Sequence, residues 1–161
     1  MNRSKGPGEA GLDGLVSRLQ QETPLWQAFL ATYRQVVERL SAQMLSDHQL
    51  PLEWFDVLIH LAEVPDGRLR QRDLRDRLLL SESGVSRLLV RMEKAGVLER
   101  RPAGDDRRGV EVALTEAGAV VLATAVESHL DLVKRLFTDK LTVTDRVALE
   151  HILTKLTSPS S

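Results

Sequence analysis

The residues best suited to chemistry lie between 82 and 95, in a segment with helical spacing. At about 100° per residue, four apolar residues share one side of this predicted helix: Val85, Leu88, Leu89 and Met92. The opposite side carries hydroxyls and cations: Ser83, Ser86, Arg87, Val90, Arg91 and Lys94. A helix N-terminus with a serine can meet a phosphate, and an arginine one turn on can reach guanine O6 and N7. The segment therefore predicts a helix that enters a major groove.

A solvated helix face without a partner is the alternative interpretation of these side chains. Arg87 and Arg91 lie four residues apart, with no carboxylate between them on that face. Two cations at this spacing repel each other, so the pair adds nothing to a surface that only meets water. The spacing favours a binding face.

The distribution of charge supports the same interpretation, although the net charge of the chain is only −1. Residues 66–108 hold 12 Lys and Arg against 8 Asp and Glu, and eleven of the 12 are arginines. The other 118 residues hold 10 basic against 15 acidic side chains. A basic segment within a mildly acidic chain is typical of an electrostatically positioned binding face.

Several classes of function are excluded by what the sequence lacks. Without cysteine there is no disulfide framework, thiolate zinc site, iron–sulfur cluster, cysteine nucleophile or thiol redox sensor. No nucleotide-binding loop or hydrolase motif is present, and the four histidines never pair at i,i+3 or i,i+4. No apolar stretch resembles a signal peptide or a membrane span. We therefore expect a cytoplasmic binding protein that is not an enzyme, with no cofactor and no membrane partner.

The elements around the helix at 82–95 predict a winged helix. A short basic helix over 70–79, anchored by Leu74 and Leu78, precedes it after a very short connection, as in a helix–turn–helix. Ser81 is a suitable N-cap, and Gly96 suits the end of the helix. Candidate strands at 97–101 and 109–114, joined by a polar turn cluster, then form a hairpin.

Long amphipathic helices flank this unit, and their apolar surface exceeds what one small winged helix can cover. Thr23-Pro24 opens the first, Thr115 caps another that is apolar on two sides, and Thr142 with Asp145 opens the last. We expect a flexible arm over 1–22 that can hold a short helix, with residues 1–10 disordered. A dimerisation helix over 23–50, a winged helix-turn-helix over 51–115, dimerisation helices over 116–157 and a tail over 158–161 follow.

Residues 68–118 resemble the DNA-binding domain of MarR-family transcriptional regulators. The resemblance rests on Val85-Ser86-Arg87-Leu88, on the wing sequence Asp106-Arg107-Arg108-Gly109 and on the junction Leu114-Thr115-Glu116-x-Gly118. It implies that 82–95 is the recognition helix and that Arg108 reaches a minor groove from the wing, braced by Asp106. It also implies that Ser83, Ser86 and Arg87 contact base edges or phosphates. The helix order from about 24 to 157 fits the family as well.

The predicted DNA-binding residues combine the helix face, the wing and the preceding basic helix: Arg70, Arg75, Ser81, Ser83, Gly84, Ser86, Arg87, Arg91, Lys94, Asp106, Arg107 and Arg108. Two residues depart from the family pattern. Arg75 stands where a small alanine is usual, so it adds a phosphate contact or forces a local repacking. Val90 stands where an acidic or polar residue is common, which argues against polar base reading there.

The resemblance further implies a crevice for a small aromatic or phenolic anion between the dimerisation helices and the winged helix. The candidate ligand-binding residues are Trp26, Tyr33, Trp54 and His60, although each aromatic taken singly also suits an ordinary core position.

The prediction is a mainly α protein with a small β-hairpin wing and long N- and C-terminal dimerisation helices. We expect a homodimeric, ligand-responsive repressor that binds pseudo-palindromic double-stranded DNA. The alternatives are a winged-helix protein-interaction module without sequence-specific DNA binding, a metal-responsive regulator and the dimerisation half of a transferase.

Overall fold

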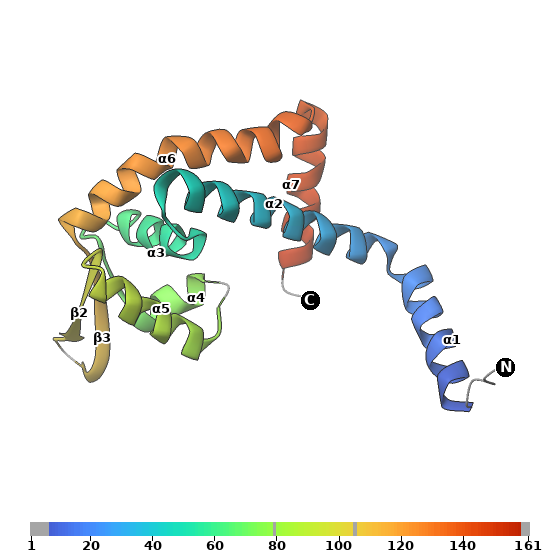
Figure 1. Cartoon of the computed structure of the whole chain (residues 1–161), viewed down its shortest axis with the longest axis horizontal. Coiled ribbons are helices and arrows are strands. Elements are labelled where there is room, and N and C mark those ends of the chain that lie inside the picture. The colour runs from blue at the N-terminus through green and yellow to red at the C-terminus, as the bar shows by residue number, and fades with distance from the viewer. Residues whose placement is uncertain (1–6, 79, 105, 159–161) are drawn as a thin grey trace. The chain divides into compact units, whose positions relative to one another are not determined.

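The computed structural model describes residues 7–78, 80–104 and 106–158. The chain divides into two compact units, one ending at Arg39 and one beginning at Leu40. The second unit contains the predicted winged helix, and its elements are labelled in Figure 1.

The first unit is helical from Pro7 onward. Helix α1 spans Pro7–Glu22, and α2, Pro24–His48, begins in this unit and ends in the second. The disordered arm was therefore predicted too long, because Pro7 is well placed to start a helix and residues 7–10 belong to α1. The predicted start of the second helix at Thr23-Pro24 is confirmed, since α2 begins at Pro24. The Thr23 hydroxyl donates back to the Leu19 carbonyl at 2.7 Å, and this residue alone separates α1 from α2.

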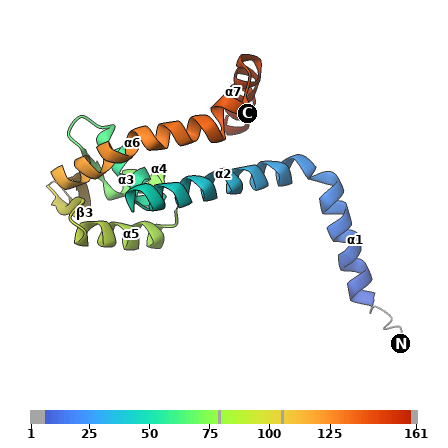
Figure 2. The ribbon, with the colours of Figure 1, turned by 45° about the horizontal axis from the view of Figure 1, so that its top comes forward.

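The described residues of the second unit form five further α-helices. These are α3 Leu52–Ala62, α4 Gln71–Arg77, α5 Glu82–Lys94, α6 Glu116–Leu136 and α7 Val143–Thr157, with a 3₁₀ turn η1 at Thr138–Lys140. The core of the unit is mainly leucine, and the end of α2 adds Met44 to it. Its other buried residues include Val57, Leu58, Leu61, Leu74, Leu88, Leu89 and Met92. Helix α6 leaves the sheet and runs over α3, as both ribbon views show (Figures 1 and 2).

A three-stranded antiparallel sheet forms the wing. Strands β2, Leu98–Ala103, and β3, Asp106–Leu114, make the predicted hairpin, with Arg100 opposite Val112. Strand β1, Arg68–Arg70, pairs with the other edge of β3, which gives the order β1-β3-β2. The sequence did not predict β1. Three residues show no alternation of their own, and pairing with β3 defines the strand. The basic helix predicted from residue 70 accordingly starts at Gln71.

The junction between the wing and α6 is a very close contact between backbones. The Thr115 hydroxyl accepts a hydrogen bond from the Gly118 backbone N–H at 3.0 Å and donates to the Gly96 carbonyl at 2.7 Å. Gly118 is buried, and a Cβ at this position would collide with the Val97 carbonyl and approach the Leu114 side chain to 2.9 Å. The first turn of α6 therefore lies directly against the backbone at the base of the wing.

Replacing Gly118 by alanine tests this close approach. We expect Gly118→Ala to lower the free energy of unfolding by about 2 kcal/mol, because the backbone carbonyl cannot move aside as a flexible side chain can. Gly14→Ala is the control, since a Cβ there would meet no atom within 4 Å and alanine favours a helix interior. Urea denaturation of both variants measures the difference. Equal stability of the two variants would contradict the close packing of Gly118.

Helices α3 and α6 also meet through an aromatic stack. The His129 ring lies 4.3 Å from the Phe55 ring, with 27° between their planes. Its Nδ1 atom is buried without a hydrogen-bond partner among the residues that the structure describes. Burial lowers the pKa of His129, and the nearby Asp56 carboxylate opposes part of that shift. The lowered pKa favours the neutral imidazole in the folded protein.

This stack predicts a pH dependence of stability. Because the folded-state pKa of His129 lies below its value in the unfolded chain, the unfolded state binds more protons as the pH falls below about 6.5. The stability present at neutral pH should therefore decline through that range. His129→Phe should retain the stack and lose this component, whereas His151→Gln, on the exposed face of α7, should not. Denaturation at a series of pH values measures both. Parallel curves for wild type and His129→Phe would refute the assignment.

Candidate nucleic-acid interface

Helix α5 presents the predicted face to solvent. Val85, Leu88, Leu89 and Met92 are buried, as expected. Ser83, Arg87, Arg91 and Lys94 are exposed, and Ser86 and Val90 are half-buried. The helix starts where the sequence predicted, because the Ser81 hydroxyl accepts a hydrogen bond from the Gly84 N–H at 3.2 Å. It ends at a left-handed Gly96, with φ of +76°.

The far end of α5 is held to the wing by a residue pair that was not among the predicted site residues. The Arg100 guanidinium donates two hydrogen bonds to the Glu93 carboxylate, at 2.9 and 2.7 Å, and the Arg100 backbone N–H donates a third at 3.2 Å. These hydrogen bonds lower the pKa of Glu93. The pair joins α5 to β2, so it helps to fix the orientation of the helix. The seven-residue separation gives no periodic signal that would have shown it.

The cations of the basic segment, residues 66–108, fall into two groups. Several arginines pair with carboxylates, including Arg68 with Glu111 at 3.6 Å and Arg77 with Glu63 at 3.8 Å. By contrast, four cations of this segment form no ion pair with any residue that the structure describes: Arg70, Arg87, Arg91 and Lys94. Three of these four lie on the exposed face of α5. Within the basic segment, that face therefore carries positive charge that the protein itself leaves unneutralised.

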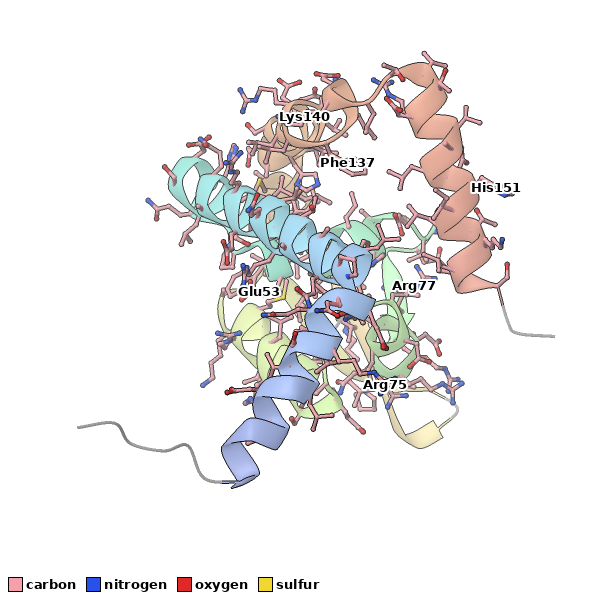
Figure 3. All side chains as sticks on the ribbon, turned by 90° about the vertical axis from the view of Figure 1, so that its right-hand side faces the viewer. Glu53, Arg75, Arg77, Phe137, Lys140 and His151 are labelled. Carbon is pink, nitrogen blue, oxygen red and sulfur yellow. The ribbon has the colours of Figure 1, made fainter. Side chains whose placement is uncertain are left out.

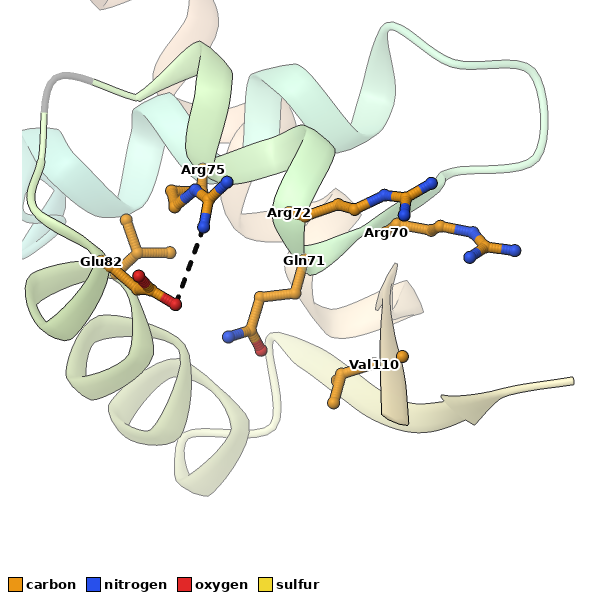
Figure 4. A pocket seen from close by; sticks show the side chains of 8 residues that line it. Arg70, Gln71, Arg72, Arg75, Glu82 and Val110 are labelled. Carbon is orange, nitrogen blue, oxygen red and sulfur yellow. Dashed lines mark ion pairs between the residues drawn. The ribbon is translucent and has the colours of Figure 1, made fainter. Parts of the chain in front are cut away.

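Two hollows flank α5. One, of about 230 Å³, lies between α4, α5 and β3 and is lined by Arg70, Gln71, Arg72, Arg75, Glu82, Val85, Gly109 and Val110 (Figure 4). The other, of about 670 Å³, is lined by Glu53, Leu80, Gly84, Ser86, Arg87, Leu88, Val90 and Arg91. With open space on both sides, α5 stands out as a ridge, which is the shape that a helix needs to enter a major groove.

Arg75 forms ion pairs within the protein but remains partly exposed. Both Arg75 and Arg77 extend from α4 (Figure 3). The Arg75 guanidinium lies 3.2 Å from an Asp76 carboxylate oxygen and 3.7 Å from a Glu82 oxygen. The Arg75 side chain is 37% exposed, while Leu74 beside it is buried.

At the wing the structure describes the backbone of Asp106, Arg107 and Arg108, which belongs to β3. Their side chains lie outside the described part of the chain, and the expected bracing of Arg108 by Asp106 lies outside it as well. Gly109 and Val110, the next residues along β3, line the smaller hollow beside α5.

The four candidate ligand-binding residues occupy different surroundings. Trp26 and Tyr33 are exposed on α2 in the first unit, where Trp26 stacks on Phe29 at 6.0 Å. Trp54 packs against the core of the second unit. His60 Nδ1 lies 3.1 Å from a Glu63 oxygen. Neither Trp54 nor His60 lines either of the two hollows beside α5.

Within residues 7–78, 80–104 and 106–158, no three His, Asp or Glu side chains come together as a metal site would require. Over the same residues, no helix combines the length and the apolar content needed to cross a membrane.

The connectivity of α3, β1, α4, α5, the β2–β3 hairpin and α6 defines a winged-helix protein. Comparisons with known proteins indicate which winged-helix family this chain resembles. A sequence model of the MarR family matches residues 48–109. An HTH-type transcriptional regulator from Bacillus cereus is 29% identical over 118 residues, which cover 73% of this chain and 77% of that protein. The chain is therefore similar to transcriptional regulators of the MarR family.

Two crystal structures from Streptomyces coelicolor are similar over most of the chain. AbsC, a MarR-family transcriptional regulator, has a TM-score of 0.78 and 29% identity, covering 84% of this chain and 91% of its own. Sco3205, a MarR-family regulator solved in complex with DNA, has a TM-score of 0.79 and 28% identity, covering 84% of this chain and 85% of its own. The resemblance found in the sequence is thus confirmed.

Proposed function

We propose that this protein is a transcriptional regulator that binds pseudo-palindromic double-stranded DNA as a homodimer. The unpaired cations on the projecting face of α5 are the observation that carries the proposal, because duplex DNA offers the matching phosphates and base edges. The similar regulator Sco3205 was solved in complex with DNA, which supports the same interpretation.

The side chains of α5 divide between base reading and phosphate contact. Ser83, Ser86 and Arg87 lie near the start of the helix, where recognition helices meet base edges. Arg91 and Lys94 follow one and two turns later, and we assign them with Arg70 to phosphates. Ser81 and Gly84 act indirectly, because the hydrogen bond between them caps the helix and holds its first turn. Arg107 and Arg108 on the wing would enter a minor groove, which offers shape and potential but a degenerate base code.

Dimerisation is supported by apolar surface that the single chain leaves uncovered. On α6 and α7, and at the residue that follows α6, the exposed large apolar side chains are Val120, Leu130, Phe137, Val143, Val147, Ile152, Leu153 and Leu156. Large apolar side chains exposed in this number on two helices are typical of a protein–protein interface. A second copy of the chain would cover it, and two-fold symmetry would present two recognition helices to successive major grooves.

We further propose that the regulator represses and responds to a small aromatic or phenolic anion. Such a ligand would act by favouring a dimer whose recognition helices no longer match the spacing of the half-sites. Trp26, Tyr33, Trp54 and His60 remain the candidate residues. The exposed aromatic side chains of Trp26 and Tyr33 support this proposal.

Leu130→Glu tests the dimer. Leu130 is 45% exposed on α6, and a carboxylate there would have to be buried without a partner in the dimer. We expect a monomer or an aggregate that no longer binds operator DNA. Arg135→Glu adds a carboxylate at an exposed position on another side of α6 and should remain dimeric. Sedimentation velocity separates the states. A dimeric Leu130→Glu protein would place the interface elsewhere.

Arg87 and Arg108 test DNA recognition together. The experiment compares wild type, Arg87→Ala and Arg108→Ala on the operator upstream of the protein's own gene and on a scrambled duplex, over a salt series. We expect Arg87→Ala to lose about 1–3 kcal/mol on the operator and to flatten the preference at one base per half-site. Arg108→Ala should weaken both duplexes more evenly and reduce the salt slope by about one unit for each phosphate that the arginine no longer neutralises.

Two results would change the assignments. If Arg87→Ala weakens both duplexes equally, Arg87 holds a phosphate and specificity lies elsewhere. If the wild-type protein binds neither duplex, the winged helix is a protein-interaction module whose arginines meet acidic partners.

A further inference from the structure

An acidic residue stands at the leading end of the otherwise basic recognition face. Glu82 is the first residue of α5, and its side chain is 81% exposed. It lines the smaller hollow with three arginines, from α4 and the end of β1, and with residues of β3 (Figure 4). A carboxylate at this position repels phosphates, so it weakens general binding to DNA.

The helix geometry places Glu82 next to Ser86, one of the residues expected to read bases. At about 100° per residue, Glu82 and Ser86 differ by about 40° around the helix axis and lie one turn apart. Ser86 lines the larger hollow together with Arg87 and Arg91, whereas Glu82 lines the smaller one. Glu82 therefore lies beside the row that contains Ser86, at the helix N-terminus, the end that approaches base edges most closely in helix–turn–helix proteins.

Arg75 restricts where this carboxylate can lie. Its Nη1 atom is 3.7 Å from Glu82 Oε1, across the turn between α4 and α5, while its Nη2 atom lies 3.2 Å from Asp76 Oδ1. The guanidinium is thus shared between an anchor on its own helix and the first residue of the recognition helix. The dashed line in Figure 4 marks the Arg75–Glu82 pair.

The chemistry of a carboxylate selects among the base edges. An ionised glutamate accepts hydrogen bonds and cannot donate them. In the major groove guanine presents acceptors and thymine presents an acceptor beside its methyl group. Adenine presents its N6 donor next to the N7 acceptor, whereas cytosine presents the N4 donor. A single carboxylate oxygen therefore suits cytosine best and is repelled to some extent by the other three bases.

We propose that Glu82 is a specificity-determining residue that requires cytosine at one position of each half-site, and that Arg75 is the residue that positions it. The inference rests on the proposed DNA-binding function and deepens it. It also gives Arg75 a different role from the phosphate contact expected from the sequence. The favourable interaction of Glu82 with the helix dipole is a separate effect, independent of DNA sequence.

The experiment selects binding sites from a randomised duplex library with the full-length protein. Wild type should enrich cytosine at one position per half-site, by about tenfold over the other bases. Glu82→Ala should lose this preference while keeping the preference set by Arg87. Glu82→Gln should shift the same position toward adenine, because a glutamine amide can both donate to N7 and accept from N6.

Glu116→Gln is the matched control for charge. Glu116 is exposed and is the first residue of α6, directly after the capping residue Thr115, as Glu82 follows Ser81. This variant removes one negative charge and one helix-dipole interaction outside the recognition face, so its site preference should equal that of wild type. Thermal melting of all variants checks that they fold.

The outcomes separate the inference from the proposed function. If Glu82→Ala and Glu82→Gln bind all sequences more tightly by the same factor, with unchanged base preferences, Glu82 only repels phosphates and the inference fails. A wild-type site with no cytosine requirement also overturns it, although the protein is then still a sequence-specific regulator. Failure of wild type to enrich any sequence overturns the proposed function itself.

Arg75 variants test the positioning role. Arg75→Ala should flatten the cytosine preference, keep the affinity for scrambled duplex within about twofold and leave the salt slope unchanged. Arg75→Lys should retain part of the preference, because it keeps a cation within reach of Glu82. If Arg75→Ala instead weakens all duplexes and lowers the salt slope by about one unit per subunit, Arg75 holds a phosphate.

Discussion

The burial of one side of α5 is the constraint on which the remaining features of the interface depend. Val85, Leu88, Leu89 and Met92 are almost fully covered, so the rotation of the helix about its axis is fixed by the core. A turn of one residue, about 100°, would expose these four side chains and bury charged ones, at a cost of several kcal/mol. The cap at Ser81 and the Glu93–Arg100 pair then fix where the helix begins and how it tilts.

The arginines of the basic segment fall into two groups, those that form ion pairs within the protein and those that do not. Those that meet carboxylates belong to exposed or half-buried pairs, which contribute little to stability because water screens them, and several of them join neighbouring elements. Among the side chains that the structure describes, most of those without a carboxylate lie on the outer face of α5. Because counterions rather than protein groups neutralise them, binding a polyanion releases those counterions and gains entropy. The net charge of −1 conceals this division, because the acidic excess lies outside the basic segment.

Local signals in the sequence were sufficient for most of the fold. Apolar periodicity placed the long helices, and hydroxyl caps placed the starts of α5, α6 and α7, including the Thr142–Asp145 capping box. The features that escaped prediction depend on partners distant in sequence or on geometry that leaves no periodic trace. Strand β1 exists because β3 pairs with it, and the contacts of Arg75 with Glu82 and of Glu93 with Arg100 form across turns. The exposed face of α5 followed from the sequence, but the acidic residue at its start was not singled out.

Thr115 joins the two ends of the wing at its base. Thr115 donates to the Gly96 carbonyl and accepts from Gly118, so the chain that leaves α5 and the chain that enters α6 are joined where the hairpin starts and ends. The tip, around the exposed Gly104, lies beyond this closure. Loop entropy grows slowly with length and exposed tips tolerate insertions. Insertions or deletions at this tip can therefore change the length of the wing, and its minor-groove contacts, without displacing α5 and α6.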